Sequence, residues 1–234
     1  MSSLNNILSI ARKEGRTVLS EQESKIILKN ESISITEPKL ATSAKEAIEI
    51  SEKIGFPVVL KISSNDITHK SDVGGVRVGL KYKDEINENF TGMLKQVKEQ
   101  APEAVIQGIT VQPMAPPNGV EVIVGVTRDE QFGPVVMFGL GGIAVEILQD
   151  VSFRIAPLTD LDAEEMIKEI KGFRMLTGYR AYEPVDLESL KLLILKVSKL
   201  AMETEDLMEM DLNPVFAYAN GVIAADARII LIDN

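Results

Sequence analysis

The side chains best suited to phosphate chemistry lie in a polar loop that contains the only histidine of the sequence, His69. The loop runs from Ser63 to Gly75 between two apolar runs and ends in the pair Gly74 and Gly75. An imidazole with a pKa near ~6.5 is largely neutral at physiological pH and can attack a phosphoryl group. Unclaimed backbone N–H groups can bind phosphate oxygens, and Lys61 in the preceding apolar run adds an ammonium group. Because the Walker spacing is absent, a solvated loop with a surface histidine and an edge-strand lysine remains an open interpretation.

A second group of candidates consists of oxygen ligands near the C-terminus: Asp211, Asn213 and Asp226. They fall on two expected strands joined by a tight turn at Asn220-Gly221, so they can converge on one cation. Mg²⁺ takes few protein oxygens and completes its shell with water and nucleotide phosphates, which suits so sparse a set. The alternative is that polar residues flank these strands only for solubility.

A third feature is a glycine-rich segment over residues 138–142, followed by Glu146, Asp150 and Arg154. Three glycines just past a strand can let a ligand approach the backbone closely. Glycine-rich turns are common, however, so this segment by itself favours a structural role.

Composition and charge narrow the class of protein. The 234 residues carry a net charge of −10, which opposes binding to nucleic acid backbones. The absence of cysteine excludes disulfides, thiolate metal sites and cysteine redox chemistry. No signal peptide and no apolar run of about 20 residues is present, so we expect no membrane association and a cytoplasmic location. An anionic substrate must therefore be captured by a local positive site.

The elements expected to position these residues alternate between helical and extended patterns. Capping-box spacings at Ser20/Glu23 and Ser43/Glu46 begin two short helices, and Gly55 ends the second. Further helices are expected over 84–100, 162–171 and 186–202, from apolar periodicity and acidic first turns. Strands are expected over 32–36, 57–62, 76–80, 105–114, 120–127, 134–138, 212–218 and 222–231.

This pattern predicts an α+β fold in two lobes. The strand-rich middle, from 105 to 138, reads as an antiparallel meander, because turn residues separate its segments. No repeat and no long linker is evident, and the boundary is expected within residues 112–117. We therefore predict one lobe with the N-terminal helices over residues 1–112 and a second lobe over residues 113–234.

Several of these segments together resemble one family. They are 57–62, 69–76, 138–142, Glu146 with Asp150 and Arg154, and 211–214 with 226–228. Over residues 19–231 the sequence is similar to the beta subunit of ADP-forming acetyl-CoA (acyl-CoA) synthetases. The resemblance implies an ATP-grasp fold, in which two α+β lobes clamp ATP or ADP with Mg²⁺. It implies the reaction acyl-CoA + ADP + phosphate ⇌ carboxylic acid + CoA + ATP. A separate CoA-binding alpha subunit would be the partner, with α2β2 the expected assembly.

The resemblance also implies residue roles. It assigns His69 as a mobile phosphohistidine carried on the loop with Gly74 and Gly75, and Lys61 as the nucleotide-phosphate lysine. Gln112, Pro113 and Met114 would line the adenine, Asn213 and Asp226 would bind magnesium, and Asp211 would orient the phosphohistidine. Two positions depart from the family pattern: Ala144, where an aromatic residue is common, and Ala181, where glycine is usual.

Two other functions remain open from the sequence. A stand-alone ATP-grasp carboxylate ligase would make an acyl phosphate and would not need His69. A regulatory nucleotide-binding subunit would tolerate the loss of both His69 and Asp226. The three hypotheses therefore differ in whether His69 is essential.

Overall fold

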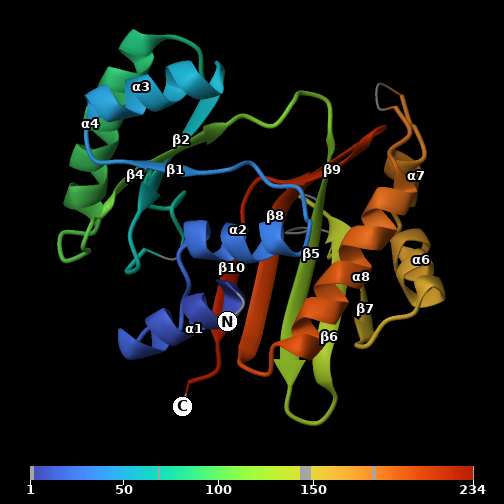
Figure 1. The fold of residues 1–234 in the computed structure, drawn as a ribbon. Coiled ribbons are helices and arrows are strands. Elements are labelled where there is room, and N and C mark those ends of the chain that lie inside the picture. The colour runs from blue at the N-terminus through green and yellow to red at the C-terminus, as the bar shows by residue number, and fades with distance from the viewer. Residues whose placement is uncertain (1–2, 68, 143–148, 181–182, 234) are drawn as a thin grey trace. The chain divides into compact units, whose positions relative to one another are not determined.

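The computed structural model describes residues 3–67, 69–142, 149–180 and 183–233, and it divides into two compact units (Figure 1). Unit 1 comprises the described residues of Met1–Leu19, Glu23–Ile35 and Ala115–Asn234, and unit 2 those of Ser20–Gln22 and Thr36–Met114. No helix among the described residues is long and apolar enough to cross a membrane. The elements are α1 (Ser3–Lys13), α2 (Glu21–Asn30), β1 (Lys39–Ala41), α3 (Ala44–Ile54), β2 (Val58–Ser63), β3 (Val76–Leu80), α4 (Lys83–Gln100), β4 (Gly108–Pro113), β5 (Val120–Asp129), β6 (Gly133–Leu140), β7 (Val151–Ile155), α6 (Asp160–Glu169), α7 (Phe173–Leu176), α8 (Leu187–Glu203), β8 (Leu207–Tyr218), β9 (Gly221–Ala224) and β10 (Arg228–Leu231).

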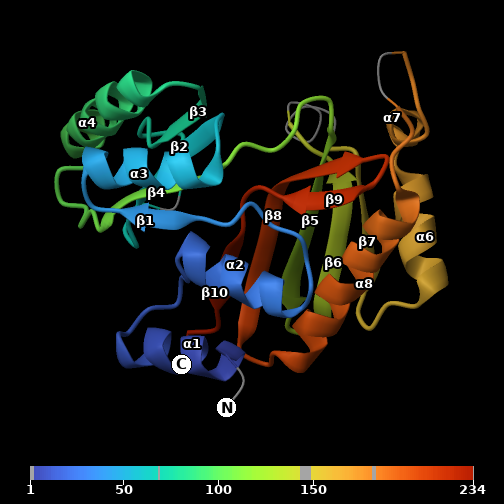
Figure 2. The same cartoon turned by 45° about the horizontal axis from the view of Figure 1, so that its top comes forward.

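Unit 2 is an antiparallel sheet with the strand order β1-β4-β2-β3, covered by α3 and α4 (Figure 2). Helix α3 begins at Ser43, whose hydroxyl accepts a hydrogen bond from the N–H of Glu46, and ends at Gly55, where φ is 92°. This left-handed region favours glycine. The predicted helix is confirmed at both ends. Helix α4 buries a stripe of one residue per turn against the sheet: Ile86, Phe90, Met93 and Val97.

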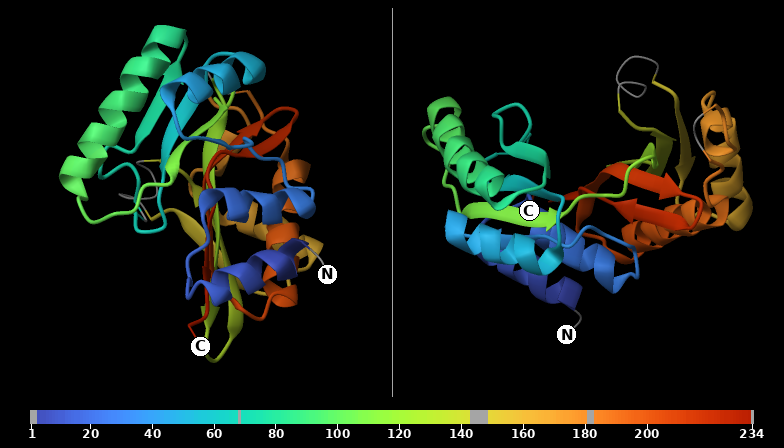
Figure 3. Two further views of the ribbon diagram at one scale, coloured as in Figure 1. Left: turned by 60° about the vertical axis from the view of Figure 1, so that its left-hand side comes forward. Right: turned by 90° about the horizontal axis from the view of Figure 1, so that it is seen from above.

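Unit 1 contains a larger antiparallel sheet with the order β10-β8-β5-β6-β7 among the described residues. The long strand β8 pairs with β10 at its start and with β9 at its end. Helices α1, α2 and α8 lie on one face of this sheet (Figures 1 and 3), and α6 packs beside α8. Phe138, Ile194 and Leu212 are fully buried in the core that these elements share.

Three sequence predictions about strands are wrong. Residues 32–36 form no strand because Ser32 turns the chain with φ 55°, and only Ile35 makes an isolated bridge, to Ala224. The meander does not exist as predicted, because β4 pairs in the sheet of unit 2 whereas β5 and β6 form a hairpin in unit 1. The predicted strand 222–231 is divided into β9 and β10, and Asp226 lies in the interruption. Strand β7 and helix α1 had not been predicted.

The two units also correct the predicted division of the chain. The change of unit between Met114 and Ala115 falls within the expected boundary segment, residues 112–117. The helices α1 and most of α2, however, belong to unit 1 and not to the lobe predicted for residues 1–112. The reason is packing, since Ile7, Leu8 and Leu28 share one apolar core with the strands of unit 1.

Candidate functional site

A buried polar face on the sheet of unit 2 carries two of the candidate residues. In the antiparallel pair β2·β4, Lys61 lies opposite Thr110, and Val59 lies opposite Gln112. Opposed residues share one face of a sheet, so Lys61, Thr110 and Gln112 project from the same side. Their exposed fractions are 6%, 3% and 2%, whereas the alternate residues of β2 enter the apolar core under α3 and α4. Polar side chains are rarely this buried without a role, and β2 is an inner strand. The edge-strand interpretation of Lys61 is therefore wrong.

An ion cluster surrounds Lys61 within unit 2. Its ammonium Nζ lies 2.8 Å from Oε1 of Glu21, the first residue of α2. The Nζ of Lys70 lies 3.3 Å from Oε2 of the same carboxylate. The side chains of Glu21, Lys61 and Lys70 are 4%, 7% and 19% exposed. One buried carboxylate thus contacts both the candidate phosphate lysine and the residue that follows His69.

The loop that carries His69 is closed at its base by backbone hydrogen bonds. The N–H of Gly75 donates to the carbonyl of Lys70 at 2.7 Å, and the N–H of Ile62 donates to the carbonyl of Gly75 at 2.8 Å. A Cβ atom on Gly75 would lie 2.5 Å from Cγ2 of Ile62, so this close approach requires glycine. The exposed His69 immediately precedes this closed turn. Movement of the loop stays a prediction.

Gly74 is held by a second set of contacts. It has φ 65°, and its carbonyl accepts a hydrogen bond from Nη1 of Arg77 at 2.7 Å. The other guanidinium nitrogen, Nη2, donates to Oε1 of Gln96 on α4 at 2.7 Å. The glycine pair therefore fixes the base of the loop to β3 and α4.

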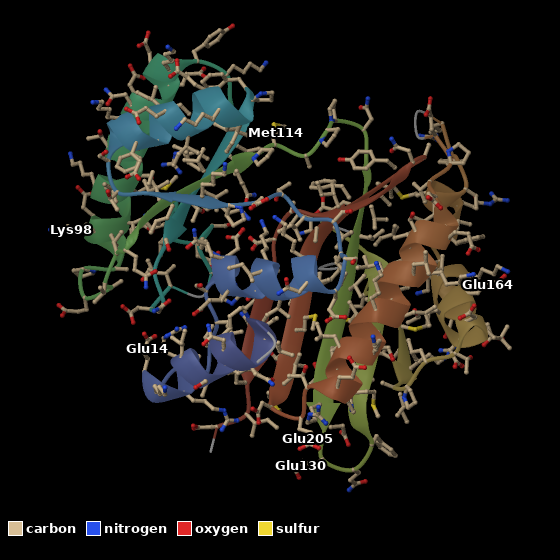
Figure 4. The ribbon with its side chains drawn as sticks, viewed as in Figure 1. Glu14, Lys98, Met114, Glu130, Glu164 and Glu205 are labelled. Carbon is tan, nitrogen blue, oxygen red and sulfur yellow. The ribbon has the colours of Figure 1, made fainter. Side chains whose placement is uncertain are left out.

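The segment predicted to meet adenine is the end of β4. Pro113 lies opposite Val58, and the N–H of Met114 donates to the carbonyl of Pro57 at 3.2 Å. Figure 4 shows Met114 where the chain leaves this sheet. The sheet thus brings Gln112 onto the face that bears Lys61 and leaves Met114 at its end.

The predicted metal ligands lie together in unit 1. Asp211 on β8 is opposite Arg228 on β10, and Asp226 follows β9. The N–H of Ala225 donates to the carbonyl of Pro214 at 2.9 Å, which links the backbone beside Asp226 to the backbone beside Asn213. Antiparallel pairing therefore makes Asn213 and Asp226 neighbours.

The donor set at this place fits Mg²⁺. One oxygen of Asp226 accepts the N–H of Ala227 at 2.8 Å, which orients the carboxylate. No group of three or more His, Cys, Asp or Glu side chains suited to a metal occurs in the described part of the chain. Two hard oxygen donors of this kind would suit a magnesium ion that keeps water and phosphate among its ligands. These residues belong to unit 1, whereas Lys61 and His69 belong to unit 2.

The glycine-rich segment over 138–142 has a structural explanation. The N–H of Gly141 donates to the carbonyl of Glu121 at 2.7 Å, and a Cβ on Gly141 would lie 2.5 Å from Cγ of Glu121. A Cβ on Gly139 would lie 2.7 Å from the carbonyl oxygen of Asp150. Close packing thus requires both glycines.

Asp150 and Arg154, which follow this segment, also make structural contacts. The carboxylate of Asp150 accepts the N–H groups of Lys171 and Gly172, each at 2.7 Å. A hydrogen bond to Glu169 raises the pKa of Arg154 above its ordinary value. Glu146, Ala144 and Ala181 lie outside the described residues.

Comparison with known proteins identifies the class. The ATP-grasp domain family matches residues 10–231, so the chain belongs to this family. The ATP-grasp fold predicted from the sequence is confirmed.

More specific similarities point to one kind of subunit. The chain is 47% identical, over 99% of both chains, to the beta subunit of acetate–CoA ligase [ADP-forming] I from Pyrococcus furiosus. It superposes with a TM-score of 0.95 and 50% identity, over 97% of this chain and 99% of the other, on acetyl-coenzyme A synthetase 1 from Ca. Korarchaeum cryptofilum in complex with coenzyme A and Ca-AMPCP. A second structure of that enzyme holds Mg-AMPPCP, with a phosphohistidine segment pointing towards the nucleotide binding site (TM-score 0.86, 45% identity, 98% and 100% covered). The predicted resemblance is confirmed.

Sequence reasoning missed Glu21. The capping-box spacing drew attention to Ser20 and Glu23, but Glu23 binds Arg16, with oxygen–nitrogen distances of 2.9 and 3.0 Å. The only sequence signal for Glu21 was an acidic residue in the first turn of a helix, which many helices have.

Proposed function

We propose that this chain is the nucleotide-binding beta subunit of an ADP-forming acyl-CoA synthetase and that it transfers a phosphoryl group between His69 and ADP. The observation that carries the proposal is the largely buried cluster of Lys61, Glu21 and Lys70, in which Lys70 is the residue that follows His69 in the sequence. A cationic cluster of this kind neutralises phosphate charge, which is the main requirement of phosphoryl transfer. The names of the relatives, acetate–CoA ligase [ADP-forming] among them, support the same reaction.

In the direction of ATP synthesis, the phosphoryl group leaves the imidazole of His69. The N–P bond breaks, a terminal phosphate oxygen of ADP forms the new O–P bond, and the imidazole nitrogen takes up a proton. Lys61 neutralises the phosphates, and backbone groups of Gln112 to Met114 bind the adenine edge. Asn213 and Asp226 would hold Mg²⁺, which supplies further charge neutralisation when bound. Asp211 orients the phosphohistidine.

A partner must supply the rest of the reaction. The relative in Pyrococcus furiosus is named a beta subunit, which supports an alpha subunit that binds CoA, and we propose an α2β2 assembly. That subunit would form the first phosphorylated intermediate and pass the phosphoryl group to His69.

Labelling with γ-labelled ATP and Mg²⁺ tests the proposal. The wild type is expected to carry acid-labile, base-stable label, and His69→Ala to lose both the label and ATP synthesis while still binding ADP. Ser71→Ala, an exposed position in the same loop, serves as the matched control and should keep its label. Full turnover by His69→Ala would contradict the relay and favour direct phosphoryl transfer from the alpha subunit to ADP.

A further inference from the structure

The carboxylate of Glu21 links two parts of unit 2 that are far apart in sequence. Lys61 lies on β2, and Lys70 lies in the loop just after His69. Both ammonium groups contact this carboxylate, one on each oxygen, at 2.8 and 3.3 Å. The strand that holds the phosphate lysine and the loop that holds the histidine are therefore joined through one side chain.

We propose that Glu21 is a positioning residue of the phosphoryl relay, because it docks the His69 loop beside Lys61 through Lys70. This inference rests on the proposed function, in which His69 exchanges a phosphoryl group with the nucleotide. Glu21 itself touches no reacting atom in this arrangement. It acts through the two lysines.

Burial explains why a carboxylate is needed there. The Lys61 and Glu21 side chains are less than a tenth exposed, and an ammonium group is costly to bury without a counter-charge. Two ammonium groups gathered at one place also repel each other, most strongly where water is excluded. Glu21 offsets part of this positive charge, which allows the two ammonium groups to lie on one carboxylate.

The backbone makes Lys70 an effective anchor for His69. Its carbonyl oxygen accepts the N–H of Gly75 at 2.7 Å while its Nζ contacts Glu21. Lys70 is thus held at both its main chain and its side chain, and His69 is the next residue along the chain. Because His69 is bonded directly to Lys70, the range of the imidazole is limited while Lys70 contacts Glu21. This contact therefore keeps His69 near β2, the strand that carries Lys61.

The same contacts offer a way to release the loop. A phosphoryl group arriving at Lys61 competes with the Glu21 carboxylate for the ammonium groups, because phosphate oxygens are strong charge-assisted acceptors. When Lys70 leaves Glu21, the loop loses this side-chain contact beside His69, while the backbone bonds and the Arg77 contact at its base remain. The contact between Lys70 and Glu21, which docks the His69 loop, would therefore depend on whether phosphate is bound at Lys61.

The test compares ADP affinity with the rate of phosphoryl transfer. In Glu21→Gln, which keeps the shape but removes the charge, labelling of His69 by γ-labelled ATP and Mg²⁺ should slow about tenfold or more, as for directly coupled residues. The affinity for ADP·Mg²⁺, measured by calorimetry, should stay within about threefold, because Lys61 remains. Glu21→Asp should recover part of the rate. Glu52→Gln, which removes the carboxylate of the exposed Lys83–Glu52 pair in the same unit, is the matched control and should label as the wild type does.

Lys70→Met provides the second arm. If Glu21 acts through Lys70, then Lys70→Met should slow labelling to a similar extent, and the double variant should be no slower than either single variant. Additive effects, or labelling of Glu21→Gln within about twofold of the wild type, would overturn the inference. If Glu21→Gln fails to fold, normal labelling of Lys70→Met overturns it alone. A wild type that takes no label on His69 refutes the proposed function itself, an outcome distinct from slow labelling confined to these variants.

Discussion

Replacing Lys61 by methionine tests the role of the buried cluster most directly. Methionine has a similar length and no charge, so it removes the ammonium group with little change in volume. A hydrogen bond to a charged group contributes about 1.5–3 kcal/mol, and each 1.4 kcal/mol is tenfold in affinity. We therefore expect Lys61→Met to raise the dissociation constant for ADP·Mg²⁺ about 10- to 150-fold.

The same change has a cost in stability that the structure allows us to bound. Removing one partner of a buried ion pair costs about 3–5 kcal/mol when the remaining charge has no other partner. Here Lys70 still contacts the Glu21 carboxylate at 3.3 Å, so the loss should fall below that range. We expect Lys61→Met to stay folded with a lowered melting temperature, because the Glu21 carboxylate keeps a counter-charge.

Calorimetric titration with ADP·Mg²⁺ and thermal unfolding measured on the same sample separate the two effects. Lys83→Met removes an exposed ion pair to Glu52 in the same unit and should leave both quantities unchanged. A folded Lys61→Met protein with the ADP affinity of the wild type would refute the reasoning. Lys61 would then be only the counter-ion of Glu21.

Three further predictions concern the metal, the loop and a helix cap. Asp226→Asn should raise the Mg²⁺ concentration for half-maximal turnover, and an unchanged metal dependence would contradict the ligand assignment. Gly75→Ala should lower the free energy of unfolding by about 1–3 kcal/mol, because the added Cβ clashes with Ile62. Gly92→Ala, inside α4, has open space around it and should raise the free energy of unfolding by about 0.5–1 kcal/mol. Equal melting temperatures for the two variants would argue against the packing account. Hydrogen bonds from the side chain and N–H of Ser189, the third residue of α8, lower the pKa of Asp186. Its stabilising effect should therefore be present at neutral pH and be lost as pH falls below the ordinary range of aspartate and through the lowered pKa. Denaturation of Asp186→Ala should accordingly show a deficit of about 0.5–2 kcal/mol at pH 7 that vanishes in acid, and a deficit independent of pH would be inconsistent with this cap.

The sequence by itself determined the local features. Capping residues and apolar periodicity depend on neighbours within a few positions, so Ser43 and Gly55 predicted the ends of α3, and the stripe from Ile86 to Val97 predicted α4. The loop around His69 and the run containing Lys61 were also recognisable, because their polarity contrasts with the strands beside them. The family resemblance then supplied the fold, which the comparisons confirmed.

Only the tertiary structure decided which distant groups meet. Periodicity predicts that residues 105–114 form a strand but not which strand it pairs with, and β4 joins β2 in unit 2 rather than β5. Likewise, Glu21 and Lys61 are 40 residues apart, and their contact depends on the tertiary packing of residues 20–22 within unit 2. A carboxylate in the first turn of a helix looks like an ordinary dipole partner in sequence, and packing beside β2 turned it into a buried counter-ion.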